Sequence, residues 1–186
     1  MVNLYLGFLL LVGAERLLEL ALSRRNAARA FARGAIAPPG DPFAAIAVAH
    51  CLFLVACALE VLLLERPFPG AAGWIALALA LLAQALRYWA VATLGDRWNV
   101  RVIVEPDAPP VTGGPYRWVR HPNYLAVIVE LLCVPLVHGA WLTALVFGAW
   151  NAWLLRRRIR VEEAALGAGW TAVFASLPRF LPGARR

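Results

Sequence analysis

Lysine is absent from this chain, and all eighteen basic residues are arginine. Cysteine is scarce: Cys51, Cys57 and Cys133 lie inside apolar runs and show no CxxC spacing. That pattern excludes a disulfide framework and a cysteine zinc site, and we predict no metal site. The chain also lacks a strand-flanked G-x-G-x-x-G fingerprint, which excludes a soluble Rossmann domain as the means of binding a cofactor.

Charged residues are few, at 16% of the chain, whereas hydrophobic residues make up 62%. The mean hydropathy is +0.68. Soluble domains contain roughly 45–50% apolar residues, so the composition predicts an integral membrane protein. A length of 186 residues suits one membrane domain, residues 1–186. The net charge of +7 does not indicate nucleic-acid binding, because the arginines lie between apolar runs and not on a soluble face with exposed aromatic residues.

The apolar residues fall into five runs, at residues 3–22, 43–64, 73–94, 123–137 and 140–155. The first three are long enough for a bilayer core of roughly 30 Å. The last two are shorter and are joined at His138 and Gly139. We therefore predict an all-α, polytopic membrane protein with about five transmembrane segments, the last two forming a short helical hairpin. Residues 1–94 would hold the first three helices.

The arginines indicate which side of the membrane each connection occupies. Residues 23–42 contain four, residues 95–121 contain four, and the tail from Arg156 to Arg186 contains seven, against Arg66 alone on the other side. The positive-inside rule then predicts an external N-terminus and a cytoplasmic C-terminus. The first run lacks a positive n-region and is interrupted by charges, so we expect a retained helix and not a signal peptide. Exclusive use of arginine suggests a GC-rich, bacterial genome, and hence the inner (cytoplasmic) membrane.

Several polar residues fall inside the predicted helices. Glu15 and Glu19 are four residues apart, so their shared face should look into the protein or toward the interface. Gln84 and Arg87 likewise share a face. His50 stands alone among apolar residues and is expected to pack or to form a hydrogen bond between helices.

The richest polar stretch is residues 111–130, VTGGPYRWVRHPNYLAVIVE. Pro122 suits the first position of a helix, which would place His121 at the cap and Asn123 and Tyr124 in the first turn. Free backbone N–H groups at that helix start, with Arg120 close by, would form a site for an anionic group.

Carboxylates provide a second cluster. Glu130 lies seven residues after Asn123 on the same helical face, and an acid at that depth is costly unless it is paired, which marks a site or an interhelical contact. Glu162 and Glu163 form the only carboxylate pair in the tail. The predicted topology places this pair on the same side as residues 111–124, so the basic and acidic clusters can meet at one cavity mouth.

A simpler interpretation is a membrane collar, in which arginines set orientation and aromatic residues form the interfacial belt. This interpretation accounts for Arg97, Trp98, Arg101 and Trp118. It does not account for His-Pro-Asn-Tyr in succession followed by Glu130.

A Gly-Gly-Pro-Tyr turn, the RHPNY segment, a helical hairpin and Glu-Glu-Ala-Ala-Leu follow one another in this order. Together they resemble the isoprenylcysteine carboxyl methyltransferase family and its relatives over residues 94–182. The relatives include bacterial enzymes that methylate alkylpyrones and phenolic lipids and, more remotely, phospholipid N-methyltransferases. The resemblance implies that S-adenosylmethionine binds on the cytoplasmic side, with residues 95–186 as the cofactor-binding catalytic half.

The resemblance also implies roles for particular residues. Arg120 would lie near the reacting group or the cofactor carboxylate. The family often has two tyrosines where this chain has Trp170 and Phe174, which would preserve stacking but not a hydroxyl contact. From the resemblance and the residues together, we predict as cofactor-binding residues Tyr116, His121, Pro122, Asn123, Tyr124, Glu162 and Trp170, and as catalytic residues Arg120, Glu130 and Glu163.

The expected function is transfer of a methyl group from S-adenosylmethionine to a lipidic acceptor, most simply by O-methylation. The acceptor would be a small lipid or a lipidated molecule that enters from the bilayer. A carboxylate acceptor needs no general base, whereas a phenol or enol would gain from one, supplied by His121, Glu130 or a tail glutamate. The alternatives are an enzyme like the phospholipid N-methyltransferases, or a non-enzymatic membrane subunit or lipid-binding scaffold. The sequence leaves the acceptor and the oligomeric state open.

Overall fold

The structure, a computed structural model, describes residues 1–106 and 108–180. The predicted tail residues Pro182, Arg185 and Arg186 lie outside the described residues. Five α-helices occupy the described part: α1 (Val2–Ala32), α2 (Phe43–Leu63), α3 (Ala71–Leu94), α4 (Pro122–Leu136) and α5 (Trp141–Val173), with two 3₁₀ turns, η1 (Gly95–Arg97) and η2 (Gly114–Arg117). The described residues contain no β-strand, only one isolated bridge between Ile36 and Val104. The all-α prediction is confirmed.

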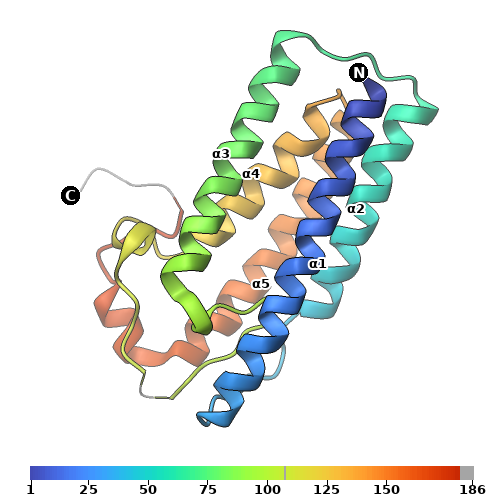
Figure 1. Cartoon of the computed structure of the whole chain (residues 1–186). Coiled ribbons are helices and arrows are strands. Elements are labelled where there is room, and N and C mark those ends of the chain that lie inside the picture. The colour runs from blue at the N-terminus through green and yellow to red at the C-terminus, as the bar shows by residue number, and fades with distance from the viewer. Residues whose placement is uncertain (107, 181–186) are drawn as a thin grey trace.

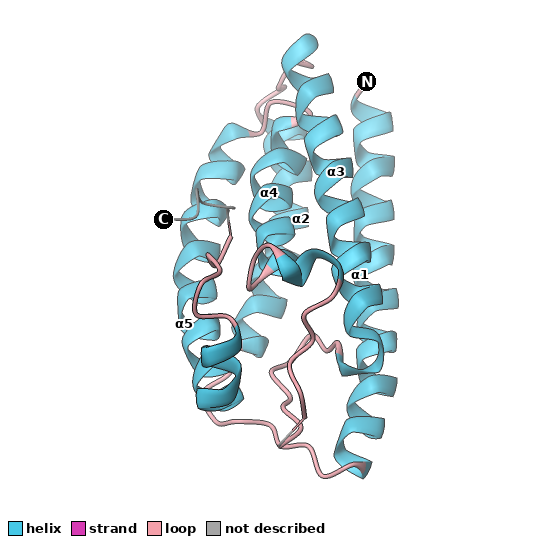
Figure 2. Cartoon of the chain, turned by 90° about the vertical axis from the view of Figure 1, so that its left-hand side faces the viewer, coloured by secondary structure: helices cyan, strands magenta, loops and turns pink. Residues whose placement is uncertain are grey.

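The helices lie side by side and alternate in direction (Figure 1). α4 packs between α3 and α5, and α2 packs against α5 and α1. The long loop between α3 and α4, the last turns of α5 and the C-terminal end of α1 gather at one end of the bundle (Figure 2). The apolar core joins α1, α2, α4 and α5 through residues that include Tyr5, Leu9, Phe53, Cys57, Val61, Leu131, Val134 and Phe147.

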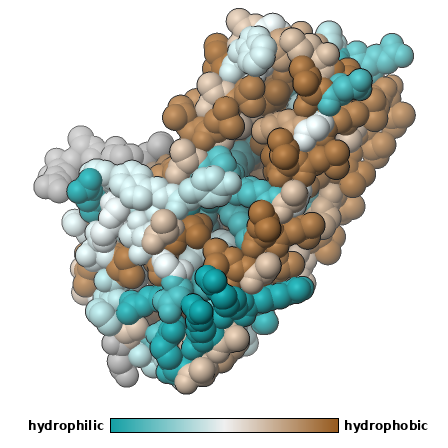
Figure 3. Space-filling view, viewed as in Figure 1, coloured by the Kyte–Doolittle hydropathy of each residue, from teal (hydrophilic) through white to brown (hydrophobic). Residues whose placement is uncertain are grey.

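The outer surface is that of a membrane protein. Leu10, Leu11, Leu17 and Leu18 on α1 are 69–75% exposed, which a soluble protein would avoid over a contiguous face. Figure 3 shows hydrophobic side chains over most of the bundle and hydrophilic ones gathered at the loop-bearing end. Within the described residues, two helices are long and apolar enough to cross a bilayer, Phe43–Leu63 and Ala71–Arg97, and Pro122–Leu136 is apolar but shorter.

Two helices extend beyond their apolar runs. α1 continues to Ala32 through the segment 23–32, which we expected to be a polar connection, and α5 continues to Val173, past the apolar run that ends at Leu155. The expectation was wrong because the end of an apolar run marks where a helix leaves the membrane, not where it ends. Arginine, alanine and glutamate are good helix formers, and residues 14–33 contain neither glycine nor proline.

The extension of α1 holds the loop that follows α3. The Asn26 side chain donates a hydrogen bond of 2.9 Å to the Trp98 carbonyl. Farther along, the Val102 amide donates to the Asp41 carboxylate at 2.9 Å. The loop 95–106 is thus tied to the N-terminal part of the chain, which keeps it over the end of the bundle.

A buried carboxylate fixes the start of α5. Glu60 on α2 accepts hydrogen bonds from the Thr143 amide (2.7 Å), the Thr143 hydroxyl (2.8 Å) and the Leu142 amide (3.2 Å). It also pairs with Arg66 at 3.1 Å. The first amides of a helix have no partner in their own helix, so this carboxylate provides the cap from a neighbouring helix.

We expect Glu60→Gln to destabilise the protein, because a neutral amide replaces the charge that several donors share. Hydrogen bonds to charged groups contribute about 1.5–3 kcal/mol each, so we expect a loss of about 2 kcal/mol and a Tm lower by about 4–8 °C. Thermal unfolding in detergent measures the difference. Glu65→Gln, at an exposed carboxylate five residues away, is the control and should leave the Tm unchanged. Equal Tm values for the two variants would contradict the capping role.

Candidate cofactor cavity

A cavity of about 480 Å³ opens at the loop-bearing end of the bundle. This volume falls within the roughly 300–1,000 Å³ of small-molecule sites. Its walls come from the loop 97–111, the start of α4 and the last turns of α5. Seven of the residues implicated by the sequence line it: Tyr116, Arg120, His121, Asn123, Tyr124, Glu162 and Trp170.

The RHPNY segment forms the start of α4 as expected. Pro122 is the first helical residue and is buried, and His121 is the N-cap residue with φ −130° and ψ 63°. The backbone amides of Arg120 and His121 are not free for an anion. They donate to the carbonyls of Pro178 (3.0 Å) and Arg179 (3.1 Å), so the segment after α5 pairs with the start of α4.

The Arg120 side chain strengthens the same junction. Its Nε donates to the Leu177 carbonyl at 2.6 Å, and its Nη2 donates to the Ala175 carbonyl at 3.2 Å. Arg120 borders the cavity. Because its guanidinium is committed to main-chain carbonyls, its direct contribution is to hold the chain after α5 against α4.

The acidic pair of α5 meets the start of α4. His121 Nε2 lies 3.1 Å from the Glu163 carboxylate, and the Tyr124 hydroxyl donates to Glu162 at 2.5 Å. The His121 and Tyr124 rings stack, with centroids 5.2 Å apart and planes 25° apart. Glu163 therefore pairs with the N-cap residue of α4 and Glu162 with a residue of its first turn, and Glu162, His121 and Tyr124 all line the cavity.

Arg179 completes this arrangement. It donates two hydrogen bonds to Glu163, from Nε at 3.0 Å and from Nη2 at 2.6 Å. These bonds, helped by His121, hold the pKa of Glu163 below its usual value. Glu163 therefore stays ionised and orients His121. Arg179 was not among the predicted site residues, because in the sequence it is one of seven arginines in the tail.

An aromatic wall faces His121. α5 kinks at Gly167, whose φ of 75° favours glycine, and the following turn brings Trp170 to 5.7 Å from the His121 ring. Trp170 also contacts Phe174 at 4.7 Å. Tyr116 from η2 packs against the same cluster, and burial raises the pKa of its hydroxyl. Trp170 and Phe174, which stand where the family often has two tyrosines, therefore supply aromatic rings for stacking but no hydroxyl group.

Two buried polar atoms of cavity residues have no hydrogen-bond partner: Oδ1 of Asn123 and Nε1 of Trp98. Such atoms are costly unless something else pairs with them. Arg97, Trp98 and Arg101, which the collar interpretation accounted for, all line the cavity. Trp118 does lie outside the cavity, where it packs against Trp89 with ring centroids 5.4 Å apart.

Arg158 is a further residue beside the cavity that the sequence did not predict. This buried side chain donates to the Tyr124 hydroxyl at 2.8 Å and to the Val100 carbonyl at 2.5 Å, so it joins α4, α5 and the loop. The arginine run 156–158 was interpreted only as part of a charged tail. Its spacing of four residues before Glu162 was an available signal, because residues four apart share a helical face.

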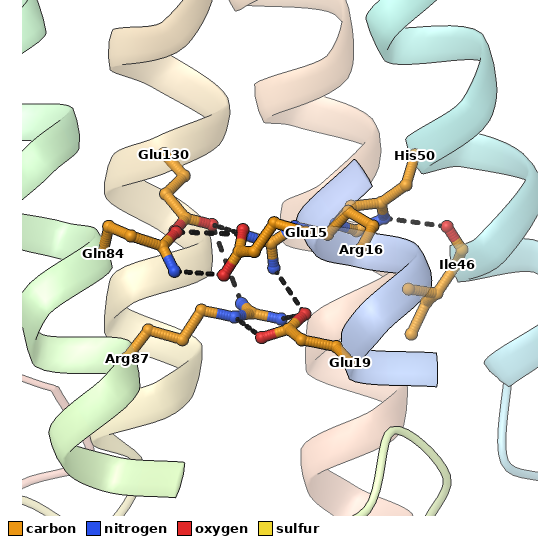
Figure 4. A network of polar contacts seen from close by, with 8 residues as sticks. All are labelled: Glu15, Arg16, Glu19, Ile46, His50, Gln84, Arg87 and Glu130. Atoms are coloured by element: carbon orange, nitrogen blue, oxygen red, sulfur yellow. Dashed lines mark hydrogen bonds and ion pairs between the residues drawn. The ribbon is translucent and has the colours of Figure 1, made fainter. Parts of the chain in front are cut away.

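Glu130 belongs to a second cluster, between α1, α3 and α4 (Figure 4). Its carboxylate lies 3.4 Å from Arg16 Nη2 and 3.6 Å from Arg87 Nη1. Arg87 also donates to Glu19 at 2.7 Å, and Gln84 donates to Glu15. Glu130 does not line the cavity. The shared faces predicted for α1 and α3 do point inward, toward each other.

This second cluster is the polar network, defined as Glu15, Arg16, Glu19, Gln84, Arg87 and Glu130. It bridges α1 and α3, which do not pack closely against each other. His50 lies nearby in Figure 4, but its Nδ1 contacts the Ile46 carbonyl of its own helix at 2.8 Å. The network lies among hydrophobic surroundings, where unpaired charges are expensive, so its members depend on one another.

We expect Arg87→Leu to lower stability by about 3 kcal/mol, because removing one partner leaves buried carboxylates uncompensated. The double variant Arg87→Leu/Glu19→Leu should recover part of this loss, since it removes the charge that Arg87 neutralises. Denaturant titration of the detergent-solubilised protein measures the free energy of unfolding of Arg87→Leu, of Glu19→Leu and of the double variant. Additive effects of the two single substitutions would show that the pair is not coupled.

Comparison with known proteins shows the family and the fold of this chain. The model of the isoprenylcysteine carboxyl methyltransferase (ICMT) family matches residues 75–168. The match begins inside α3, earlier than the resemblance seen in the motifs, and ends before Trp170 and Phe174. The two positions at which the chain departs from the common pattern therefore lie beyond the matched region.

Two bacterial proteins are similar over most of the chain. The protein YpbQ of Bacillus subtilis (strain 168) is 38% identical over 153 residues, which are 82% of this chain and 90% of that protein. A protein of Haemophilus influenzae is 30% identical over 154 residues, 82% of this chain and 89% of that protein.

Among solved structures, the eukaryotic intramembrane Ras methyltransferase ICMT is similar, with a TM-score of 0.57 and 23% identity. The match covers 74% of this chain and 52% of that one. This chain therefore shares the fold and spans about half the length of the eukaryotic protein.

Proposed function

The chain belongs to the isoprenylcysteine carboxyl methyltransferase family of membrane proteins, and we propose that it is an S-adenosylmethionine-dependent methyltransferase that acts on a lipidic acceptor. The observation that carries this proposal is the convergence of His121, Tyr124, Glu162 and Trp170 on one 480 Å³ cavity. A non-enzymatic scaffold would not need this convergence of carboxylate, imidazole and aromatic groups.

The cavity suits the chemistry of this cofactor. Glu162 can accept hydrogen bonds from the amine, Arg101 can pair with the carboxylate, and Trp170 offers a face to the adenine. The unpartnered Asn123 Oδ1 and Trp98 Nε1 provide an acceptor and a donor that a polar ligand would satisfy. When bound, S-adenosylmethionine supplies an electrophilic methyl group on sulfur, so the protein contributes chiefly alignment and removal of water.

The remaining implicated residues act around the cavity. Glu163 orients His121, which can hold a proton released by a phenolic or enolic acceptor. Arg120 fastens the chain after α5 that closes the site, and Pro122 fixes the start of α4. This arrangement is consistent with O-methylation of a phenol or an enol, because such an acceptor gains from a base.

We place the acceptor on the membrane side of the cavity. Glu130 is seven residues from Asn123 on the same face of α4, about 10 Å deeper at 1.5 Å per residue. The polar network around it lies between α1 and α3, where the polar end of a lipid can approach from the bilayer. Glu130 would then act on the acceptor and not on the cofactor.

The positions of the cavity-lining residues along the chain support a division of the domain at residues 94 and 95. Apart from Ala30 and Leu94, every residue that lines the cavity comes from residues 95–186, which we propose as the cofactor-binding half. The cavity lies at the loop-bearing end, whose surface is hydrophilic in Figure 3, and its lining includes Arg97, Arg101 and Arg120. We therefore assign that end to the cytoplasm of a bacterial cell, with the N-terminus on the opposite side of the inner membrane.

We expect Glu162→Gln and Trp170→Ala each to weaken S-adenosylmethionine binding at least about tenfold, the effect of losing about 1.4 kcal/mol. Isothermal titration calorimetry of the purified protein measures this affinity. Trp118→Ala removes an aromatic residue outside the cavity and should bind like the wild type. If Trp118→Ala weakens binding as much as Trp170→Ala, the cavity is not the cofactor site.

Transfer of labelled methyl from S-adenosylmethionine to a bacterial lipid extract tests the reaction itself. We expect label in a lipid, and its loss in His121→Ala. Mass spectrometry then identifies which lipid gained a methyl group, and whether on oxygen or nitrogen. A folded protein that binds the cofactor but labels no lipid would contradict the enzymatic proposal. An N-methylated product would favour the phospholipid N-methyltransferase alternative.

A further inference from the structure

A groove of about 520 Å³ lies on the outer side of the α4–α5 pair. Ile128 and Leu132 line it from α4, and no residue lines both this groove and the cofactor cavity. At 3.6 residues per turn, Ile128 and Leu132 lie on the face of α4 opposite to Asn123 and Glu130. The groove is therefore a separate site, which faces away from the proposed reaction centre.

The groove is apolar along most of its length and basic at one end. Leu132, Gly148 and Leu155 line the apolar part, and Arg156, Arg160 and Arg179 line the other end. Along α5, Gly148 and Arg160 are about 18 Å apart at 1.5 Å per residue. The groove thus runs from the apolar part of the helix pair to the level at which the predicted membrane segment ends.

The basic end carries a charge surplus. None of the groove-lining residues is acidic. Arg179 pairs with Glu163 at 2.6 Å, whereas no carboxylate among the described residues forms an ion pair with Arg156 or Arg160. Both of these arginines are exposed, and Arg160 Nε donates a hydrogen bond to the Arg156 carbonyl at 3.3 Å.

We propose that this groove binds one anionic phospholipid of the arginine-side leaflet. The headgroup phosphate would pair with Arg156 and Arg160, since guanidinium groups match phosphate oxygens in charge and geometry. One acyl chain would lie along the apolar part between α4 and α5. A free phosphate would leave that apolar length uncovered, and a methyl acceptor in this groove would sit on the wrong face of α4. Basic pockets between helices at the anionic leaflet are suited to such lipids.

Native mass spectrometry of the full-length protein in detergent tests the proposal. The probes are phosphatidylglycerol, phosphatidylcholine with the same acyl chains, and glycerol 3-phosphate, which has no chain. We expect one phosphatidylglycerol per protein, little phosphatidylcholine and no glycerol 3-phosphate. Arg156→Gln/Arg160→Gln should weaken phosphatidylglycerol binding about thirtyfold. Ala152→Phe, which fills the groove at an exposed position, should also weaken it.

Arg157→Gln is the matched control. Arg157 belongs to the same arginine run and is exposed, but it lies over the Trp153 ring at 5.1 Å and does not line the groove. It should bind phosphatidylglycerol like the wild type. Unchanged S-adenosylmethionine affinity in the double variant would show that the variant is folded and that the two sites are independent.

Other results would overturn the proposal. Equal loss of lipid in Arg157→Gln would show a general effect of surface charge. Equal binding of phosphatidylcholine would remove the role of the lipid's net negative charge, and equal binding of glycerol 3-phosphate would remove the role of the acyl chain. A dimer that Ala152→Phe converts to a monomer would assign the groove to a second copy of the chain.

Discussion

The contact between His121 and Glu163 joins residues 42 positions apart and sets the geometry of the cavity. Arg179 holds Glu163 from the other side, and the backbone of Pro178 and Arg179 pairs with that of Arg120 and His121. The start of α4 and the end of the chain are therefore fastened through side chains and main chain at once. This junction keeps the Trp170 ring close to the His121 ring, with centroids 5.7 Å apart.

A second constraint is that polar groups surrounded by apolar helices must be satisfied within the protein. Glu60 meets it by capping α5, and the polar network meets it by joining α1 to α3 and α4. Both arrangements use a carboxylate from one helix to satisfy donors of another. The unpartnered atoms of Asn123 and Trp98 are exceptions to this rule, and both residues line the cavity.

Much of the fold could be predicted from the sequence, because hydropathy marks membrane helices directly. The predicted runs 43–64, 73–94 and 123–137 lie within two residues of the ends of α2, α3 and α4. α1 and α5 were predicted too short, because their polar ends remain helical outside the apolar region. Pro122 at the first helical position and His121 at the cap were also predicted correctly, since proline restricts where a helix can begin.

The sequence by itself determined the helical membrane architecture and the motif at the start of α4. It also determined that the adjacent carboxylates Glu162 and Glu163 need hydrogen-bond or ion-pair partners. Only the tertiary structure decided which partners they found. His121 contacts Glu163, and the Tyr124 hydroxyl donates a hydrogen bond to Glu162. Arg120 donates to main-chain carbonyls of the segment after α5. Glu130 forms ion pairs with Arg16 and Arg87. The physical reason is that helical periodicity assigns a residue to a face of its own helix. Which neighbour that face meets depends on how distant helices and loops pack, and spacing along one segment carries no record of that packing.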